Sequence, residues 1–367
     1  MHLRRRRQVT TAGLAVCAVA LAACSSSSSS SSSSSTSAGT SSAPAAASSS
    51  NLSGTLNGSG STFQTVFQQS AIAAFRSVDA GITVNYGSGG SGKGRTDLAS
   101  GVVNYAGSDS PIPSDEASSF KGKTVLYFPV IMGPITMSYN LSGVKNLKLT
   151  PAVISDIFQA KIKTWNDPAI KAINPGVSLP STPISLAVRS DSSGTTQNFT
   201  LFLQKAVGSA WKLGSSSTIN WPSGAHAGNG NGGVAQIVKS TPGAIGYVDY
   251  ADAKASGLSF ASVKNKDGSF VAPSSASASA AGKTVTVAPN LTFAAVWSSG
   301  ATAYPITYQS WDLVYQKQSS ASTAKNLKAY IGYLLGAGQK LLPSLGYAPL
   351  PSNIDQKAKA QLSKIGS

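Results

Sequence analysis

Apolar residues recur along this chain at two spacings, three to four residues in some segments and two in others, which are typical of helices and strands respectively. In the first half, Phe63, Phe67 and Phe75 fall on one helical face. The continuous apolar run Val125–Met132 predicts a buried parallel strand, because strands covered on both faces show little polar alternation. The other elements predicted here are a strand over 82–86, a short helix starting within 96–100, a strand over 103–107 and a strand over 135–139.

A similar set of segments begins near Pro151. Thr150 is placed as an N-cap, and proline favours the first position of a helix, so a helix is predicted over Pro151–Phe158. The predicted strand Ile184–Val188 leads directly into Arg189. This alternation favours an α/β fold with parallel sheets covered by helices, and two such sheets would place a ligand cleft between two domains. The remaining predicted elements are helices over 196–207, 232–239, 323–335 and 354–365, and strands over 244–248 and 306–314.

The first 24 residues have the layout of a bacterial secretion signal. The basic run Arg4–Arg7 precedes a short apolar stretch, Thr11–Ala20, and the quartet Leu21-Ala22-Ala23-Cys24 has the form of a cleavage site. This quartet resembles the lipobox of bacterial lipoproteins, which implies cleavage before Cys24 and attachment of lipid to that residue. A secretory signal with a chance cysteine is the alternative. The apolar stretch is too short to cross a bilayer as a helix.

Residues 25–53 are almost entirely Ser, Ala, Thr and Gly, and such a segment buries too little apolar surface to offset its ordering entropy. We expect it to be a flexible tether between a lipid anchor and a folded domain. Cys17 and Cys24 are the only cysteines of the chain. After processing, therefore, no internal disulfide and no cysteine-ligated metal site is expected.

The chain is long enough for a large core or two domains, at 367 residues, and it is basic, with a formal net charge of +16. Removing Arg4–Arg7 leaves +12 for the mature part, since 16 − 4 = 12. Basic chains often bind nucleic acid. Here, however, the lysines are scattered and no aromatic residues alternate with them, so we expect a solvated basic surface and no nucleic-acid partner.

Four short polar clusters carry the candidate chemistry: Gly58–Phe63, Gly89–Gly92, Gly107–Asp109 and Arg189–Thr195. Three of them combine Gly with Ser or Thr just before a predicted helix, where free backbone N–H groups and hydroxyls suit an anion. The fourth supplies a lone carboxylate, Asp109. An ionised carboxylate only accepts hydrogen bonds, so beside an anion it favours one that carries a proton and repels a fully ionised one such as sulfate.

The glycine-rich segment Gly87–Gly94 nearly matches the phosphate-binding loop of nucleotide-binding proteins, because Lys93 follows a glycine at the required spacing. Gly94, however, replaces the Ser or Thr that would hold Mg²⁺. This disfavours a nucleotide site but leaves anion binding by the same backbone geometry. Lys93 would then add a second positive charge near the anion.

Arg189 is the candidate cation of the site, since a guanidinium grips two oxygens at once. Asp191, two residues on, would orient it, and the helix start at Ser193–Thr195 follows. Thr62 is expected to cap the first helix while still offering its hydroxyl to the anion. Catalysis is not favoured, because His226 is the only histidine of the mature part and no G-x-S-x-G sequence occurs. We expect no metal and no cofactor.

In this order, the clusters resemble those of the phosphate-binding protein of Pst-type ABC importers, a family of periplasmic or extracytoplasmic solute-binding proteins. The resemblance runs from about Gly54 to the C-terminus. The most specific stretches are Gly58–Phe63, Asn85–Asp109, Arg189–Thr195, Asn220-Trp221-Pro222 and Thr241–Val248.

The resemblance implies an α/β, two-domain periplasmic-binding-protein (type II) fold, each domain a mainly parallel sheet flanked by helices, with the ligand cleft between them. The expected segments are a signal peptide over 1–24, a disordered linker over 25–53, a discontinuous domain I over 54–128 plus 262–367, and domain II over 129–261. Carried over residue by residue, the phosphate-binding set is Thr62, Phe63 through its backbone N–H, Ser91, Asp109, Arg189, Ser193, Gly194 and Thr195, with Asp191 as the partner of the arginine. Within the glycine-rich loop, Ser88 is the alternative to Ser91.

The implied function is that of a monomeric lipoprotein, anchored through Cys24 on the extracytoplasmic face of the cell membrane. It would bind inorganic phosphate and deliver it to the permease and ATPase subunits of an ABC importer. Three alternatives stay open: a binding protein for another tetrahedral oxyanion such as sulfate, a secreted phosphatase on the same fold, and an adhesin or signalling protein that kept the fold.

Overall fold

The fold was obtained as a computed structural model, and the structure describes residues 52–367. The predicted signal peptide, the lipidation residue Cys24 and nearly all of the predicted linker lie outside the described residues. The first strand starts at Gly54, where the folded domain was predicted to begin.

Two groups of strands form one continuous sheet, in the order β2-β1-β3-β12-β4-β8-β6-β7, with β9 beside β4. Strands β2, β1 and β3 pair in parallel, as do β8, β6 and β7, whereas the pairs at the centre of the sheet are antiparallel. The strands of this sheet are β1 Gly54–Gly60, β2 Ile82–Ser88, β3 Tyr105–Ser108, β4 Val125–Tyr139, β6 Ser185–Arg189, β7 His226–Gly228, β8 Ala244–Asp249, β9 Ser259–Phe260 and β12 Thr307–Tyr315. A small separate sheet contains β5 Lys148–Leu149, β10 Ser262–Lys264 and β11 Phe270–Val271.

Strand β4 joins the two groups, and here the prediction of a parallel strand over Val125–Met132 was wrong. The strand is 15 residues long and includes the segment predicted as a separate strand. Its first part, to Pro134, pairs antiparallel with β12, and its last part, from Ile135, pairs antiparallel with β8. Both faces are buried, so the apolar run could not distinguish parallel from antiparallel pairing. Pro134 lies at the change of partner, where its missing N–H interrupts neither ladder.

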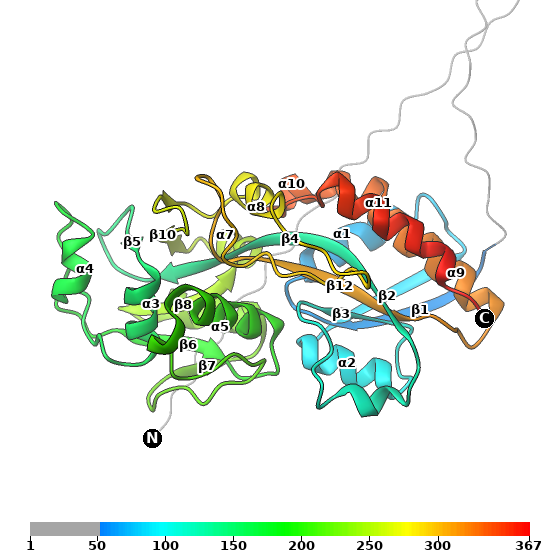
Figure 1. Cartoon of the computed structure of the whole chain (residues 1–367), viewed down its shortest axis with the longest axis horizontal. Coiled ribbons are helices and arrows are strands. Elements are labelled where there is room, and N and C mark those ends of the chain that lie inside the picture. Colours follow the sequence, from blue (N-terminus) through cyan, green and yellow to red (C-terminus); the bar gives the residue numbers. More distant parts are fainter. Residues whose placement is uncertain (1–51) are drawn as a thin grey trace, which may run out of the picture. The chain divides into compact units, whose positions relative to one another are not determined.

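We call β1, β2, β3, β12 and residues 125–134 of β4 the first strand group, and β6 to β9 with residues 135–139 of β4 the second strand group. Figure 1 shows β4 and β12 running side by side between them. The helices are α1 Thr65–Phe75, α2 Ser91–Ala99, α3 Pro151–Phe158, α4 Pro168–Ala172, α5 Gly194–Val207, α6 Gly230–Ser240, α7 Tyr250–Ala255, α8 Ser275–Gly282, α9 Ala321–Leu335, α10 Leu342–Leu345 and α11 Ser352–Gln361. Short 3₁₀ turns cover Ala117–Phe120, Gly208–Ala210, Ala337–Leu341 and Leu362–Lys364.

Helix α2 begins at Ser91, not within the predicted 96–100, so the end of the glycine-rich segment is helical. Glycine is a poor helix former, which is why the sequence pattern placed the start later. Packing explains why position 94 is a glycine. A Cβ on Gly94 would come within 2.7 Å of the Cα of Gly60 and 2.8 Å of the carbonyl oxygen of Ser59. Gly94 therefore lets α2 lie directly against β1. By contrast, α3 is as predicted, and Thr150 Oγ1 accepts the Val153 N–H at 3.3 Å.

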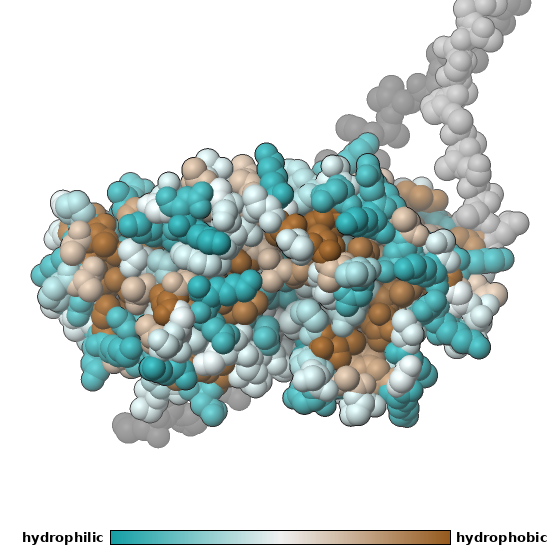
Figure 2. Space-filling model, viewed as in Figure 1, coloured by the Kyte–Doolittle hydropathy of each residue, from teal (hydrophilic) through white to brown (hydrophobic). Residues whose placement is uncertain are grey.

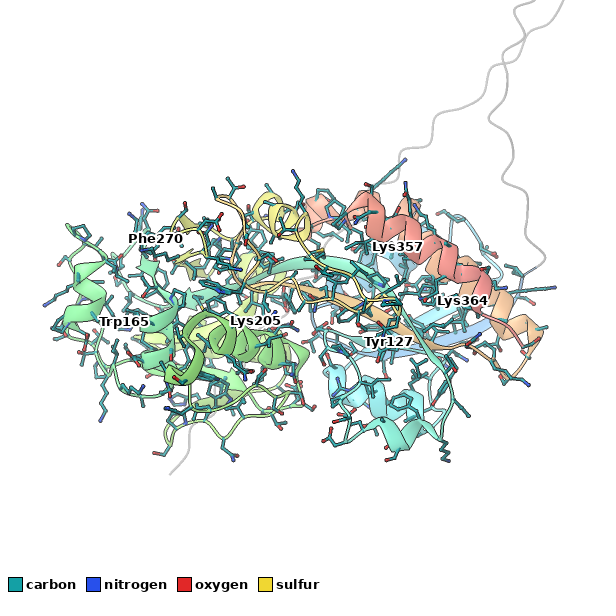
Figure 3. All side chains as sticks on the ribbon, viewed as in Figure 1. Tyr127, Trp165, Lys205, Phe270, Lys357 and Lys364 are labelled. Atoms are coloured by element: carbon teal, nitrogen blue, oxygen red, sulfur yellow. The ribbon has the colours of Figure 1, made fainter. Side chains whose placement is uncertain are left out.

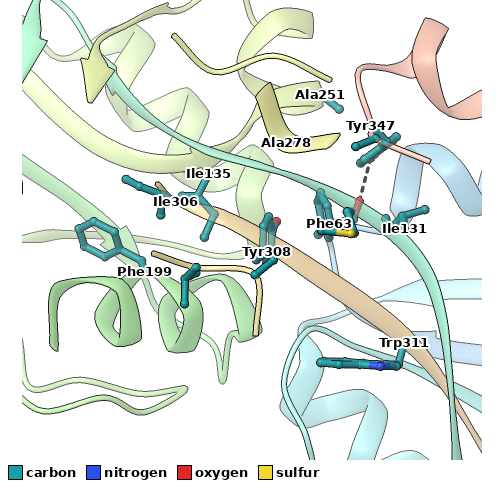
Figure 4. Close-up of a cluster of buried hydrophobic side chains, with 14 of the residues drawn as sticks. Phe63, Ile131, Ile135, Phe199, Ala251, Ala278, Ile306, Tyr308, Trp311 and Tyr347 are labelled. Carbon is teal, nitrogen blue, oxygen red and sulfur yellow. Dashed lines mark hydrogen bonds between the residues drawn. The ribbon is translucent and has the colours of Figure 1, made fainter. Parts of the chain in front are cut away.

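The apolar core is continuous between the two strand groups. Near its centre, the Phe63 ring stacks on Tyr308, with 4.0 Å between ring centroids, and meets Tyr347 edge to face. The Tyr347 hydroxyl donates to the Phe63 carbonyl at 2.8 Å, as the dashed line in Figure 4 shows. Phe63 is thus fixed through both its ring and its backbone.

The outer surface is largely polar on the face shown in Figure 2, with apolar side chains in separate groups among hydrophilic ones. Figure 3 shows Lys357 and Lys364 near the helices of the first strand group, and Trp165 in the part of the chain around the second. Within residues 52–367, no helix is long and apolar enough to span a bilayer.

Candidate anion-binding site

The four polar clusters lie at the carboxyl ends of parallel strands, which is where open α/β sheets place their ligands. Ser61 and Thr62 follow β1, and Ser91 starts α2 just after β2. Asp109 follows β3. In the second strand group, Arg189 is the last residue of β6, and α5 begins a few residues later. Parallel pairing of β2, β1 and β3 brings the first three clusters to one edge.

Asp109 is the carboxylate of the site and is 2% exposed. Its Oδ1 accepts hydrogen bonds from Ser61 Oγ at 2.5 Å and from Ser310 Oγ at 2.6 Å. Its Oδ2 has a longer contact of 3.3 Å with Ser91 Oγ. Burial raises the pKa of Asp109 above its usual value, and the donors Ser310 and Ser61 and the charge of Arg189 partly oppose this shift.

Arg189 is the cation of the site and is 6% exposed. Its Nε donates to Asp191 Oδ1 at 2.8 Å, and its Nη2 donates to Asp191 Oδ2. Its Nη1 donates to Thr195 Oγ1 at 3.3 Å. Burial alone would raise the pKa of Asp191, but the hydrogen bonds and charge of Arg189 hold the pKa of that carboxyl below its usual value. The predicted orienting role of Asp191 therefore has a matching geometry.

The start of α5 lies directly against the first strand group. Ser193 Oγ accepts the Thr196 N–H at 3.1 Å and so caps the helix. A Cβ on Gly194 would come within 2.4 Å of Ser91 Oγ and 2.6 Å of Asp109 Cβ. A side chain at Gly194 would therefore force the two groups apart.

Thr62 does not cap α1, so that expectation was wrong. The N-cap is Gln64, which makes no side-chain capping bond. Thr62 Oγ1 instead accepts from Asn231 Nδ2, at the start of α6, at 3.2 Å. The Phe63 N–H, predicted to contact the anion, donates to Ser61 Oγ at 3.1 Å.

Lys93 does not add a free positive charge to the site. Its ammonium pairs with Asp97 at 2.8 Å, and the side chain is 58% exposed. Asp97 also accepts from Ser59 Oγ at 2.7 Å. The lysine that suggested a nucleotide-binding loop is thus part of an exposed ion pair on α2, and α2 itself provides Ser91 to the site.

The structure brings all eight predicted site residues together, and it adds four that the sequence reasoning missed. Asn198 donates from Nδ2 to the Asp109 carbonyl at 2.7 Å, which ties α5 to the first strand group. Ser61 stood within a quoted cluster, and the run of Gly and Asn before α6 was a signal for Asn231. No local pattern marked Ser310 or Asn198, which lie in a buried strand and within a helix. The four added residues are Ser61, Asn198, Asn231 and Ser310.

Comparison with known proteins decides the family. A family model described as a PBP superfamily domain matches residues 40–337. Phosphate-binding protein PstS 3 of Mycobacterium leprae is 32% identical over 325 residues, which cover 85% of this chain and 87% of that protein. The chain belongs to the PstS family of phosphate-binding proteins. Another PstS protein, from Pasteurella multocida, is 34% identical over 313 residues, covering 84% of this chain and 89% of its own length.

Solved structures show the same fold as this PstS-family chain. A high-affinity periplasmic phosphate-binding protein, PfluDING, bound with phosphate, aligns with a TM-score of 0.71 at 22% identity, covering 84% of this chain and 94% of its own. A phosphate-binding protein from Stenotrophomonas maltophilia aligns with a TM-score of 0.68 at 18% identity, with the same coverage of 84% and 94%. The predicted α/β, two-domain periplasmic-binding-protein fold is confirmed. The expectation of a mainly parallel sheet in each domain was wrong, because each strand group also contains antiparallel pairs.

Proposed function

We propose that this PstS-family chain binds inorganic phosphate between its two strand groups and delivers it to an ABC-type importer. The observation that carries the proposal is the pairing of opposite groups in one site. A buried arginine, Arg189, faces the same cluster as a buried carboxylate, Asp109, whose Oδ2 has only a long contact of 3.3 Å with Ser91 Oγ. Arg189 and hydroxyls suit the oxygens of an anion, whereas Asp109 suits only the proton of a protonated one.

Each residue of the proposed site has a distinct role in replacing the water around phosphate. The hydroxyls of Thr62, Ser91, Ser193 and Thr195 donate to its oxygens, as does the Gly194 N–H. The Phe63 N–H would be shared between the anion and Ser61 Oγ, to which it donates at 3.1 Å. Arg189 offsets part of the charge, and Asp109 accepts the phosphate proton. Charge-assisted hydrogen bonds contribute about 1.5–3 kcal/mol each. We expect a micromolar or tighter Kd, about 8 kcal/mol or more.

Binding is coupled to closure of the two domains in this proposal. The proposed limits are 54–128 plus 262–367 for domain I and 129–261 for domain II. The change of β4's pairing partner between Pro134 and Ile135 supports a crossing within β4, a few residues after the proposed one. The direct contact of Gly194 with Ser91 and Asp109 supports a site that is complete only when the domains meet.

The proposed cellular setting follows from the N-terminal segment and the family. Like other PstS proteins, the chain would act outside the cytoplasm, next to the importer's permease, with the ATPase subunits on the inner side. The cleavage motif ending at Cys24 supports a lipid anchor in the membrane. We propose that the mature protein is a monomer.

Calorimetry of the mature domain with phosphate and with sulfate, at two pH values, tests this function. We expect phosphate to bind at micromolar concentration or below and sulfate at least about a hundredfold more weakly, because sulfate leaves Asp109 without a proton to accept. Displacement of phosphate by an equal concentration of sulfate would contradict the role of Asp109. Turnover of a generic phosphate ester by metal-supplemented protein would instead favour a phosphatase.

A further inference from the structure

A buried chain of hydrogen bonds leads from the core of the first strand group to Asp109. Gln64 and Gln68 lie four residues apart in the chain, at and just after the start of α1, so they share one face of the helix. They face Ser310 and Asp312, which lie two residues apart on one face of β12. All four side chains are at most 1% exposed, so bulk water does not compete for their bonds.

The orientation of both glutamine side chains follows from their partners. Gln64 Nε2 donates to the Trp311 carbonyl at 3.0 Å, and a carbonyl can only accept. The same Nε2 donates to Ser310 Oγ at 2.8 Å, while Gln64 Oε1 accepts from Gln68 Nε2 at 2.8 Å. Gln68 Oε1 in turn accepts from the Tyr330 hydroxyl at 2.6 Å. Each donor in this chain therefore points toward the site.

This chain of hydrogen bonds determines which acceptor the Ser310 hydroxyl donates to. Ser310 Oγ accepts from Gln64, and its single hydrogen has two acceptors in reach. Asp109 Oδ1, at 2.6 Å, is much closer than the Ser108 carbonyl, at 3.3 Å, so the hydrogen bond to Asp109 is favoured. Ser61 is in the same position: its Oγ accepts the Phe63 N–H, so its hydrogen points to Asp109 Oδ1. Two hydroxyl donors thus meet one carboxylate oxygen, which stabilises the ionised form and leaves Oδ2 as the acceptor.

We infer that the chain Tyr330–Gln68–Gln64–Ser310 holds Asp109 as an acceptor-only group, and that Ser310 and Gln64 are therefore specificity-determining residues for a protonated oxyanion. The inference rests on the proposed phosphate function and names the residues that set its selectivity. A buried polar chain destabilises the fold unless every group in it is bonded, whereas apolar residues could pack this region without that requirement, so the polar residues here are expected to act on Asp109.

Other titratable groups surround Asp109 and bear on its protonation. They are Arg189 from β6 and the phenols of Tyr86, Tyr308 and Tyr347. Burial raises the pKa of each phenol well above its usual value, so all three stay neutral. Asp312 branches from Gln68. Burial raises the pKa of Asp312 to about 7, and its hydrogen-bond partners are Gln68 and Gln64 and not Asp109.

The test compares Ser310→Ala with Ser310→Thr, which keeps the hydroxyl. Phosphate and sulfate affinities are measured by calorimetry between pH 5 and 8.5, and folding is checked by circular dichroism. Removing one donor from Oδ1 should make Asp109 easier to protonate. We expect Ser310→Ala to lose about tenfold or more of the phosphate preference, mostly at the acidic end. Ser310→Thr should largely retain the preference and the wild-type pH profile.

Ser138→Ala is the matched control, because Ser138 is equally buried but bonds to Thr136, in the second strand group. It should change neither the preference nor the pH profile. A folded Ser310→Ala variant with wild-type preference and pH profile would overturn the inference while leaving the phosphate function intact. If the wild-type protein does not prefer phosphate, the proposed function fails, and the inference fails with it.

Two measurements keep the inference testable if Ser310→Ala does not fold. Ser61→Ala removes the other donor from the same oxygen and should shift the pH profile in the same direction. In addition, the ¹³C carboxyl resonance of Asp109 in the wild-type protein should be that of an ionised group at pH 7. A protonated Asp109 at pH 7 would overturn the inference without any variant.

Discussion

Two aspartates in this site differ in how deeply they are buried and in what surrounds them. Asp191, in the second strand group, is bonded twice by the guanidinium of Arg189 and once by the Gly230 N–H at 3.0 Å. Asp109, in the first, is bonded mainly by hydroxyls. The pKa of Asp109, which is buried, is raised, and the pKa of Asp191, which is less completely buried, is lowered. The deeper burial of Asp109 and the full charge bonded to Asp191 both act to separate the two pKa values.

The comparison shows how the site can select its ligand. Asp191 balances the charge of Arg189, so these two residues together with Asp109 carry a formal charge of −1 when both carboxylates are ionised. Net attraction of an anion cannot then come from these three groups. Binding would depend on N–H and hydroxyl dipoles directed at the anion, and selectivity on the single acceptor, Asp109.

The largest expected loss of phosphate affinity comes from removing Arg189, the charged partner of Asp191. Arg189→Met removes the guanidinium that would contact the anion. It also leaves Asp191 without its charged partner, which should lower the free energy of unfolding by about 3–5 kcal/mol. We expect phosphate affinity to fall by more than a hundredfold in calorimetry. Lys161→Met is the matched control, since Lys161 pairs with Asp156 on the surface, with side chains 53% and 39% exposed. An equal loss in both variants would contradict the special role of the buried pair.

A third carboxyl, Asp312, extends the comparison, because it has neither an arginine nor a hydroxyl donor. Burial raises its pKa to about 7, and Gln68 Nε2 contacts both its oxygens at 3.3 Å. Since its folded pKa exceeds the unfolded value near 4, the folded state binds the proton more tightly. The resulting stability is present below pH 4 and is lost as the pH rises through 7.

Asp312→Asn removes this titration. We expect the variant to be more stable than wild type at pH 8, by up to about 4 kcal/mol, and its free energy of unfolding to depend less on pH between 4 and 7. Urea unfolding at a series of pH values measures both quantities. Identical pH profiles for variant and wild type would show that Asp312 keeps an ordinary pKa in the folded state.

Blocking closure of the site should lower phosphate affinity less than removing Arg189 does. Gly194→Ala would place a methyl group where only 2.4 Å separates it from Ser91 Oγ. We expect phosphate affinity to fall about tenfold to a hundredfold, because overpacking costs about 1–3 kcal/mol. Gly232→Ala, in α6, is the control, since no atom lies within 4 Å of its added Cβ. Wild-type affinity in Gly194→Ala would mean that the two strand groups need not meet for binding.

Salt should have the smallest effect. If Asp191 balances Arg189, phosphate affinity measured between 0.05 and 0.5 M NaCl should change by less than about fivefold, since buried groups are screened little. A steep decrease would indicate that unpaired surface lysines attract the anion, and that the basic charge of the chain drives binding.

The sequence allowed much of this site to be predicted, because its residues stand in short clusters at helix starts and strand ends. Thr62, Ser91, Asp109 and Arg189 could be proposed from local patterns of Gly, Ser and charge. The donors that control Asp109 could not all be found this way. Ser310 lies about two hundred residues along the chain from Asp109, in a buried strand whose pattern signals only packing.

Prediction of the fold from the sequence has the same limit, because local patterns do not show which distant segments pair. Most of the longer helices and strands could be located from periodicity, but the glycine-rich strand β1, the short strand β7 and the antiparallel pairing of β4 with both β12 and β8 could not. A strand buried on both faces shows the same apolar run whichever way its neighbours run. Likewise, the role of Gly94 became clear only from the closeness of Gly60 and Ser59 behind it.

The central claim is that Asp109 selects the ligand by accepting its proton. The most direct measurement is the ratio of phosphate to sulfate affinity in Asp109→Asn and in wild type, by calorimetry at pH 7. Asparagine keeps the shape but adds a donor, so the ratio should fall by about a hundredfold or more, with sulfate binding strengthened and phosphate weakened less. An unchanged ratio in a folded Asp109→Asn variant would contradict the claim.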